Sequence, residues 1–171
     1  MELHFLSNTP KELVFENIAE YIYLRKLKIN KQDNTRPWGG FFVIEETESE
    51  KFIQLYFPHL TQEELNISGK LSPKILVVAP NKRLSWQYHH RRAEIWKIIG
   101  GTAGVITSDT DEEKETKHLN IGDIIQLKQG ERHRLIGLES WGVIAEIWRH
   151  TDAHNPSDEN DIVRVQDDFG R

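Results

Sequence analysis

PNKRLSWQYHHRRAEIWKIIGG, residues 80–101, is the stretch that decides the fold of this chain. It places Gln87, His89 and Glu94 in the order Gln-x-His-x(4)-Glu, and a later stretch, GDIIQLKQGERH, ends on His133. Alternate residues of a strand share one face, so Gln87 and His89 point to the same side. Two imidazoles, one carboxylate and one amide oxygen form a suitable ligand set for a borderline divalent metal. Burying four such groups in one cavity without a cation would be costly.

Short apolar runs of β type follow one another from Phe41 onward. They are FFVIEE, KFIQLYF, KILVVAP, EIWKIIG, AGVITSD, DIIQLK and GVIAEIW. Gly, Asn and Asp clusters separate them at the spacing of a sandwich or small barrel, not of alternating strands and helices. Ahead of them, a helix start at Pro10 and apolar residues at Val14, Ile18 and Ile22 predict one or two helical turns. The sequence therefore predicts an all-β protein with a short N-terminal helical segment.

The first motif strand has two faces that can be assigned by parity. Arg83 and Ser85 share the face of the metal-binding side chains, which makes them candidate substrate-binding residues. The other face carries Trp86 and Tyr88 and needs cover from a helix, a loop or a second subunit. The N-terminal helical segment or a homodimer is expected to supply it. The charged stretch 109–117, DTDEEKETK, is expected to be solvated surface.

Composition excludes several classes of protein. The 171 residues carry a net charge of −5, which gives no basic surface for nucleic acid. There is no cysteine, so disulfides, thiolate metal sites and cysteine nucleophiles are all excluded. The N-terminus lacks the pattern of a secretory signal, and no run approaches the ~20 apolar residues that cross a bilayer. We expect a cytoplasmic protein without nucleic-acid or membrane partners.

The two motif blocks resemble those of the cupin superfamily, with Gln87 where the first histidine of that pattern stands and Lys128 in place of its proline. The segment LSWQYHHRRAEIW is similar to LSLQ-x-HHHRAEHW, which is typical of the isomerase domain of type II phosphomannose isomerases. RPWG at 36–39 and ENDIVRVQDDFGR at 159–171 also resemble motifs of that family. Four motifs in the same order cover residues 36–171, and together they are specific.

The resemblance implies a cupin double-stranded β-helix, or jelly roll, over residues 36–171, with residues 1–35 as an N-terminal helical extension. It implies an aldose–ketose isomerase that interconverts mannose 6-phosphate and fructose 6-phosphate through an enediol intermediate. The partner would be a small sugar phosphate. A divalent metal, most simply zinc given the nitrogen and oxygen ligands, would act as a Lewis acid. Its predicted ligands are Gln87, His89, Glu94 and His133.

Arg164 and Arg171 fall where the closing motif of the family has its arginines, and the resemblance implies that both serve the active site. A planar guanidinium can bind a phosphate or an enediolate through two hydrogen bonds. For Arg164 to face the metal, the C-terminal tail must fold back over the mouth of the barrel. Arg36 is expected to have a structural role in the RPWG turn.

Arg91 and Ile95 replace two histidines of the family pattern, which leaves other functions open. One is a sugar-phosphate-binding cupin that has lost the catalytic base. Another is an iron-dependent cupin dioxygenase, although Gln87 in place of a histidine argues against it. No Gly-rich phosphate loop lies near the start, so guanylyltransferase activity is not expected. The remaining histidines expected at the surface or in loops are His4, His59, His118, His150 and His154.

Overall fold

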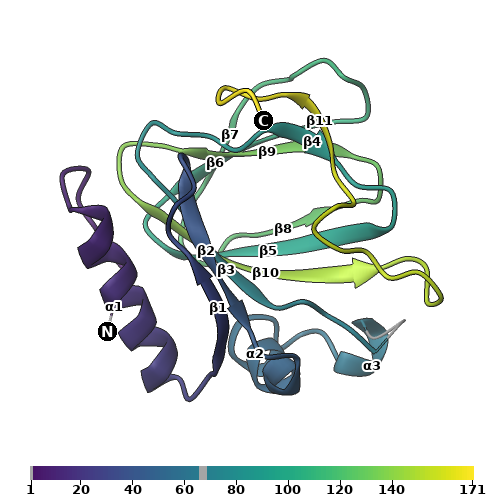
Figure 1. Ribbon diagram of the computed structural model, residues 1–171, viewed down its shortest axis with the longest axis horizontal. Coiled ribbons are helices and arrows are strands. Elements are labelled where there is room, and N and C mark those ends of the chain that lie inside the picture. The colour runs from purple at the N-terminus through teal and green to yellow at the C-terminus, as the bar shows by residue number, and fades with distance from the viewer. Residues whose placement is uncertain (1, 66–68) are drawn as a thin grey trace.

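Two antiparallel β-sheets face each other in the computed structural model, which describes residues 2–65 and 69–171 (Figure 1). One sheet has six strands in the order β1-β2-β3-β10-β5-β8, and the other has five in the order β11-β4-β9-β6-β7. The strands are β1 Ile29–Asp33, β2 Gly39–Ile44, β3 Lys74–Val78, β4 Trp86–Tyr88, β5 Arg92–Gly100, β6 Ala103–Ser108, β7 Lys117–Leu119, β8 Ile124–Leu127, β9 Arg132–Gly137, β10 Gly142–His150 and β11 Val163–Gln166. This arrangement confirms the predicted jelly-roll architecture.

Helices cover the outer face of the six-stranded sheet (Figure 1). They are α1 Lys11–Leu24, the 3-10 helix η1 Glu46–Glu48, α2 Ser49–Tyr56 and α3 Gln62–Leu65. The predicted N-terminal helix is present and spans 14 residues, more than one or two turns. Phe15 of α1 stacks on Phe42 of β2 with ring centroids 5.2 Å apart. The main apolar core therefore lies outside the sandwich, between the helices and the sheet.

The run KFIQLYF, which the sequence predicts as a strand, forms most of helix α2 instead. Phe52, Ile53 and Tyr56 are buried, whereas Gln54 and Leu55 face outward. Burial at positions i, i+1 and i+4 has the helical period and not the alternation of a strand. The prediction was wrong because a short apolar run gives little information on periodicity.

Strand β1 lies within the segment 1–35, which the sequence predicts as a helical extension. It pairs antiparallel with β2, with Ile29 opposite Ile44 and Asp33 opposite Phe41. The N-terminal segment therefore contributes an edge strand to the six-stranded sheet in addition to helix α1.

The outward face of β4 is covered by a loop. Trp86 is buried, and its indole Nε1–H donates to the Asp111 carbonyl at 2.8 Å in the charged loop between β6 and β7. Arg132 pairs with the Asp111 carboxylate at 2.8 Å, and Arg134 pairs with Glu113 at 2.5 Å. The N-terminal helix packs on the other sheet, so its predicted role in covering Trp86 was wrong. The stretch 109–117 is exposed in large part, as expected, but through these contacts it also packs against strands β4 and β9.

Replacing Phe15 by alanine should lower the free energy of unfolding by about 3–5 kcal/mol, because the ring is 1% exposed and a cavity would remain. Leu13 lies on the same helix and is 46% exposed, so Leu13→Ala should change stability little. Urea unfolding followed by circular dichroism measures both variants. Equal effects in the two would contradict the placement of α1.

Candidate functional site

His89, Glu94 and His133 converge between the two sheets. His89 follows β4 and His133 lies in β9 of the five-stranded sheet, whereas Glu94 lies in β5 of the facing sheet. Their ligand atoms all lie within 4.8 Å of one another. His89 Nε2 is 3.1 Å from Glu94 Oε1, and His133 Nε2 is 3.5 Å from Glu94 Oε2. Each of the three residues is at most 3% exposed.

The orientation of both imidazoles suits metal ligation. His89 Nδ1–H donates to the Asp161 carbonyl at 2.7 Å, and His133 Nδ1–H donates to the Glu131 carbonyl at 3.0 Å. These bonds fix the tautomer and leave each Nε2 lone pair facing Glu94. Among the residues that the structure describes, the buried Nε2 of His133 has no hydrogen-bond partner. A cation between these groups would satisfy that nitrogen, so the set fits a divalent metal.

Electrostatics favour the protonation states that a metal requires. Burial lowers the pKa of His89, and the neighbouring Glu94 only partly offsets it, so the ring is biased towards the neutral form. Burial would raise the pKa of Glu94, but the charge that His89 carries when protonated and then that of Arg92 outweigh it and hold that pKa well below its ordinary value. A neutral imidazole and an ionised carboxylate are the forms that coordinate a metal.

Gln87 and Ser85 lie next to the three converging residues. Gln87 is the cross-strand partner of His133, and the Ser85 hydroxyl donates to Gln87 Oε1 at 2.5 Å. Both side chains line the cavity that opens beside these three residues. The assignments of Gln87 as the fourth ligand and of Ser85 as a substrate-binding residue stay predictions.

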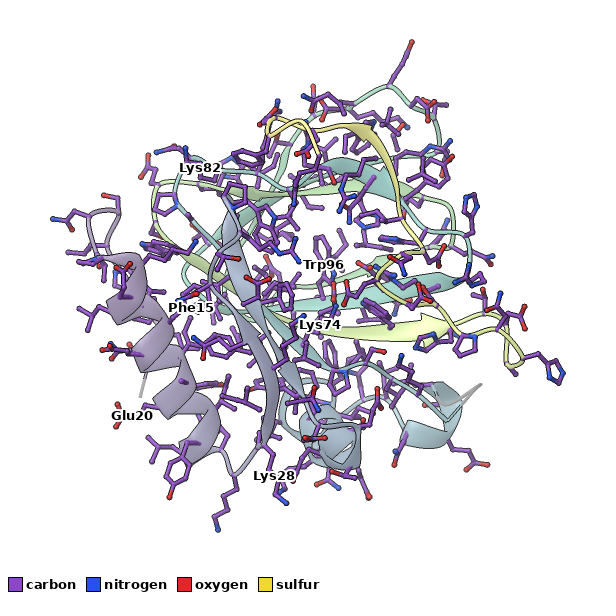
Figure 2. All side chains as sticks on the ribbon, viewed as in Figure 1. Phe15, Glu20, Lys28, Lys74, Lys82 and Trp96 are labelled. Atoms are coloured by element: carbon purple, nitrogen blue, oxygen red, sulfur yellow. The ribbon has the colours of Figure 1, made fainter. Side chains whose placement is uncertain are left out.

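The cavity beside these residues measures about 110 Å³ and lies between the sheets. Figure 2 shows two of its lining side chains, Lys74 and Trp96, in the interior of the sandwich. Further lining residues come from the turn before β2, from β10 and from the C-terminal tail: Arg36, Glu146, Arg164 and Arg171. Strands β2, β3, β4, β5 and β10 and the C-terminal tail thus all contribute side chains to one cavity.

The C-terminal tail folds back across the barrel. The connection after β10 passes from the six-stranded sheet to β11, which pairs antiparallel with β4 (Figure 1). Arg164 is thereby placed opposite Gln87, and both Arg164 and Arg171 line the cavity. Arg171 pairs with Asp167 at 2.8 Å, whereas Arg164 makes no ion pair within residues 2–65 and 69–171. The catalytic roles of the two arginines stay predictions.

Arg83 is placed away from the cavity. Its Nε and Nη2 donate to the two carboxylate oxygens of Asp168 at 2.6 and 2.9 Å, and it is not among the residues that line the cavity. The parity argument does not hold here because β4 begins only at Trp86, and Leu84 lines the cavity together with its neighbour Ser85. This placement gives no support to the predicted contact between Arg83 and a substrate.

Several charged residues of the cavity were not assigned to the site from the sequence. Lys74 and Glu146 are single charged residues inside apolar strand runs, and that pattern is a usable signal of an inward functional position. Arg92 donates to Glu94 Oε1 at 2.9 Å, and as residue i−2 on the same strand it shares its face. Arg36, expected to be structural, pairs with Asp33 and also lines the cavity.

His150 is another correction, because it is fully buried and not at the surface. Its Nδ1 accepts the backbone N–H of Ser157 at 2.9 Å, which leaves Nε2–H facing the Ser72 hydroxyl at 3.4 Å. Burial lowers the pKa of His150 to about 4. The ring is therefore a neutral structural link between the end of β10 and the tail.

Glu146 is a buried carboxyl held by two indoles. Its Oε2 accepts from Trp96 Nε1 at 2.8 Å, and its Oε1 accepts from Trp148 Nε1 at 3.0 Å. The Trp96 indole N–H also faces Glu94 Oε2 at 3.1 Å. Burial, and then the charge of Glu94, raise the pKa of Glu146 to about 8.

Residues 45–167 match the family described as "Mannose-6-phosphate isomerase C-terminal". The chain belongs to this family. It is 29% identical over 130 residues to the alginate biosynthesis protein AlgA of Pseudomonas aeruginosa, a match that covers 73% of this chain and 24% of that protein. It is 31% identical over 118 residues to a mannose-1-phosphate guanylyltransferase of Escherichia coli, with 69% and 23% covered. The chain thus matches about a quarter of the length of these relatives.

Solved structures confirm the predicted cupin fold. Oxalate decarboxylase from Lactobacillus farciminis superposes with a TM-score of 0.52 at 18% identity, over 78% of this chain and 33% of that chain. Vicilin from tomato gives a TM-score of 0.52 at 15% identity, over 81% and 35%. At these identities the likeness concerns the fold alone.

In the described part of this chain, no helix has the length and apolar character needed to span a membrane.

A variant that carries both His89→Ala and His133→Ala should lose bound metal, because two of the three converging ligand groups are removed. The wild type and His118→Ala, which changes an exposed histidine of β7, should each retain about one divalent ion per chain. Elemental analysis of the purified proteins measures this. Equal metal content in all three would refute the site.

The raised pKa of Glu146 predicts a pH-dependent stability for the metal-free protein. The Glu146 carboxyl binds a proton more tightly in the folded state than in the unfolded state. The folded state should therefore lose stability as the pH rises from 4.5, the ordinary pKa of a glutamate, towards about 8, the pKa of Glu146 in the folded protein. Glu146→Gln stays neutral, so the wild type should become less stable relative to this variant between pH 5 and about pH 9. Urea unfolding at both pH values tests this, with exposed Glu139→Gln as control. Parallel pH profiles for the wild type and Glu146→Gln would contradict it.

Proposed function

We propose that this domain is a metal-dependent isomerase that interconverts mannose 6-phosphate and fructose 6-phosphate. The observation that carries the proposal is a His–Glu–His set beside a cavity whose lining has more cationic than anionic side chains. Family membership over residues 45–167 supports the same substrate class. The basic side chains of the lining are Arg36, Lys74, Arg92, Arg164 and Arg171, and the acidic ones are Glu94, Glu146 and Glu159.

Moving a proton between C1 and C2 of a sugar requires a base, stabilisation of the developing oxyanion and an anchor for the phosphate. When bound, a divalent metal supplies Lewis acidity and an open position for sugar oxygens. Glu94 is the only charged group in the predicted ligand set, so most of the charge of the cation is retained. Gln87 is oriented by the Ser85 hydroxyl and adds a neutral oxygen.

Arg164 is the residue we assign to the developing negative charge. It lies opposite Gln87 across the β4–β11 pair and lines the cavity. A guanidinium remains charged throughout and presents two parallel donors to an enediolate or a phosphate. Arg171 lines the same cavity and is held by Asp167, so it is oriented before a substrate enters.

The two departures from the family pattern leave the lining of the cavity intact, which favours the enzyme over a binding protein without turnover. Ile95 packs in the apolar core on the outer side of the six-stranded sheet. Arg91 lies within 3.9 Å of Asp158 and 3.8 Å of Asp161, both in the C-terminal tail. Neither residue lines the cavity, so the replaced histidines take no group away from it.

A coupled assay of mannose 6-phosphate conversion, with metal-stripped protein and the same protein reloaded with zinc, tests the proposal. Turnover should depend on the metal and return on reloading. Binding of mannose 6-phosphate by the reloaded protein without any turnover would establish the binding protein instead. Reloading with manganese and cobalt in parallel guards against a wrong choice of ion.

Arg164→Lys should lower kcat by about 10²-fold or more, because the charge is kept while the second parallel hydrogen bond is lost. Metal content and thermal stability should stay at wild-type values, since Arg164 is exposed and lies on an edge strand. Arg149→Lys is the matched control, because Arg149 is an exposed arginine of β10 that does not line the cavity. Wild-type kcat in Arg164→Lys would refute the assigned role.

A further inference from the structure

Lys74 is a buried cation in the wall of the cavity. It is the first residue of β3, and its side chain is 7% exposed. Its ammonium lies 4.3 Å from the ring centre of Trp148 and 5.3 Å from that of Phe41. Aromatic faces stabilise a cation, but a buried ammonium still requires an anion. Glu159 supplies that anion through an ion pair with the Lys74 ammonium.

The two partners of this ion pair differ in exposure and in their place in the fold. Lys74 extends from a central strand and is enclosed by rings, whereas Glu159 lies in the connection between β10 and β11 with a side chain that is 68% exposed. Glu159 also lines a second cavity of about 310 Å³, which gives its side chain space to withdraw. The carboxylate can therefore leave at low cost in solvation, whereas the ammonium cannot.

The position of the Glu159 carboxylate is one of positive potential. Partial desolvation against the cavity wall would raise the pKa of Glu159, but Lys74, and more weakly Arg92 and Arg36, outweigh this and lower it. Arg92 and Arg36 already have carboxylate partners in Glu94 and Asp33. The charge that Glu159 neutralises is therefore chiefly that of Lys74.

We propose that Lys74, assisted by Arg36, forms a phosphate-monoester subsite, and that Glu159 occupies this subsite in the ligand-free protein. The assignment rests on the proposed function in that the phosphate is that of the sugar phosphate. A phosphate monoester carries up to two negative charges and three acceptor oxygens. Lys74 and Arg36 line the same cavity, 5.3 and 5.6 Å from the ring centre of Phe41, so both can serve one phosphate. The phosphate displaces a single carboxylate, which then returns to water.

In this arrangement two groups of cations in the cavity have different roles. The Lys74 subsite holds the phosphate, and Arg164 lies opposite Gln87, one of the predicted metal ligands. Competition with Glu159 makes the subsite selective, because a neutral sugar offers nothing that replaces the carboxylate on Lys74. A sugar without phosphate would therefore leave Glu159 paired with Lys74.

Titration calorimetry with inorganic phosphate on metal-free protein tests the subsite without contributions from the metal or from turnover. Glu159→Gln should bind phosphate about tenfold or more tightly than the wild type, because the internal competitor is neutral. Glu20→Gln changes an exposed carboxylate on α1, away from the cavity, and should leave the affinity unchanged (Figure 2). Equal affinities in Glu159→Gln and Glu20→Gln would overturn the proposal.

Adding Lys74→Met to Glu159→Gln should remove the gain in affinity. Circular dichroism verifies that this double variant is folded. If it does not fold, the comparison of Glu159→Gln with the wild type still tests the proposal, because that substitution changes an exposed side chain. Persistence of tight binding in a folded double variant would place the subsite elsewhere. Tighter phosphate binding without isomerase turnover would leave the subsite standing and refute the proposed function. Isomerase turnover together with an unchanged phosphate affinity in Glu159→Gln would support the proposed function and refute the subsite.

Discussion

The interior of this sandwich is organised around one buried carboxylate. Glu94 extends from the six-stranded sheet and meets the imidazoles of His89 and His133 from the facing sheet. Such a charge is tolerated only where hydrogen bonds and cations surround it, which the indole of Trp96 and the guanidinium of Arg92 provide. Both sheets must keep their register for these groups to meet, so the candidate metal site and the closure of the barrel depend on each other.

The C-terminal tail joins the predicted metal ligands to the rest of the cavity lining. The Asp161 carbonyl orients His89, while its carboxylate accepts the backbone N–H groups of His90 and Arg91 at 2.9 and 3.0 Å. These bonds and the Ser157 hydroxyl outweigh the effect of burial and lower the pKa of Asp161 to about 2. The segment that fixes a predicted metal ligand also carries Glu159 and Arg164. Displacement of Glu159 by a ligand would thus act on the same short segment that holds the His89 ring.

The sequence predicted what depends on short-range spacing. The motif around Gln87 and Glu94 gave the fold, and the strand runs were correct except for KFIQLYF, where helix α2 forms. The sequence did not predict which residues that are distant along the chain lie together in the fold. Parity gave no reliable position for Arg83 because residues 83–85 precede the regular strand. Lys74 and Glu159 are 85 residues apart, and no local pattern indicates that such residues meet.

The position of the apolar core explains how so many charges can lie inside the barrel. The larger apolar cluster joins α1 and α2 to the outer face of the six-stranded sheet, away from Glu94 and Glu146. A smaller cluster, which includes Leu76, Trp96 and Leu135, packs between the sheets beside the cavity. Most of the hydrophobic stabilisation is thus supplied outside the sandwich, since the free energy gained scales with the apolar area buried. The inner face of each sheet is consequently free to carry the charged and polar side chains that line the cavity.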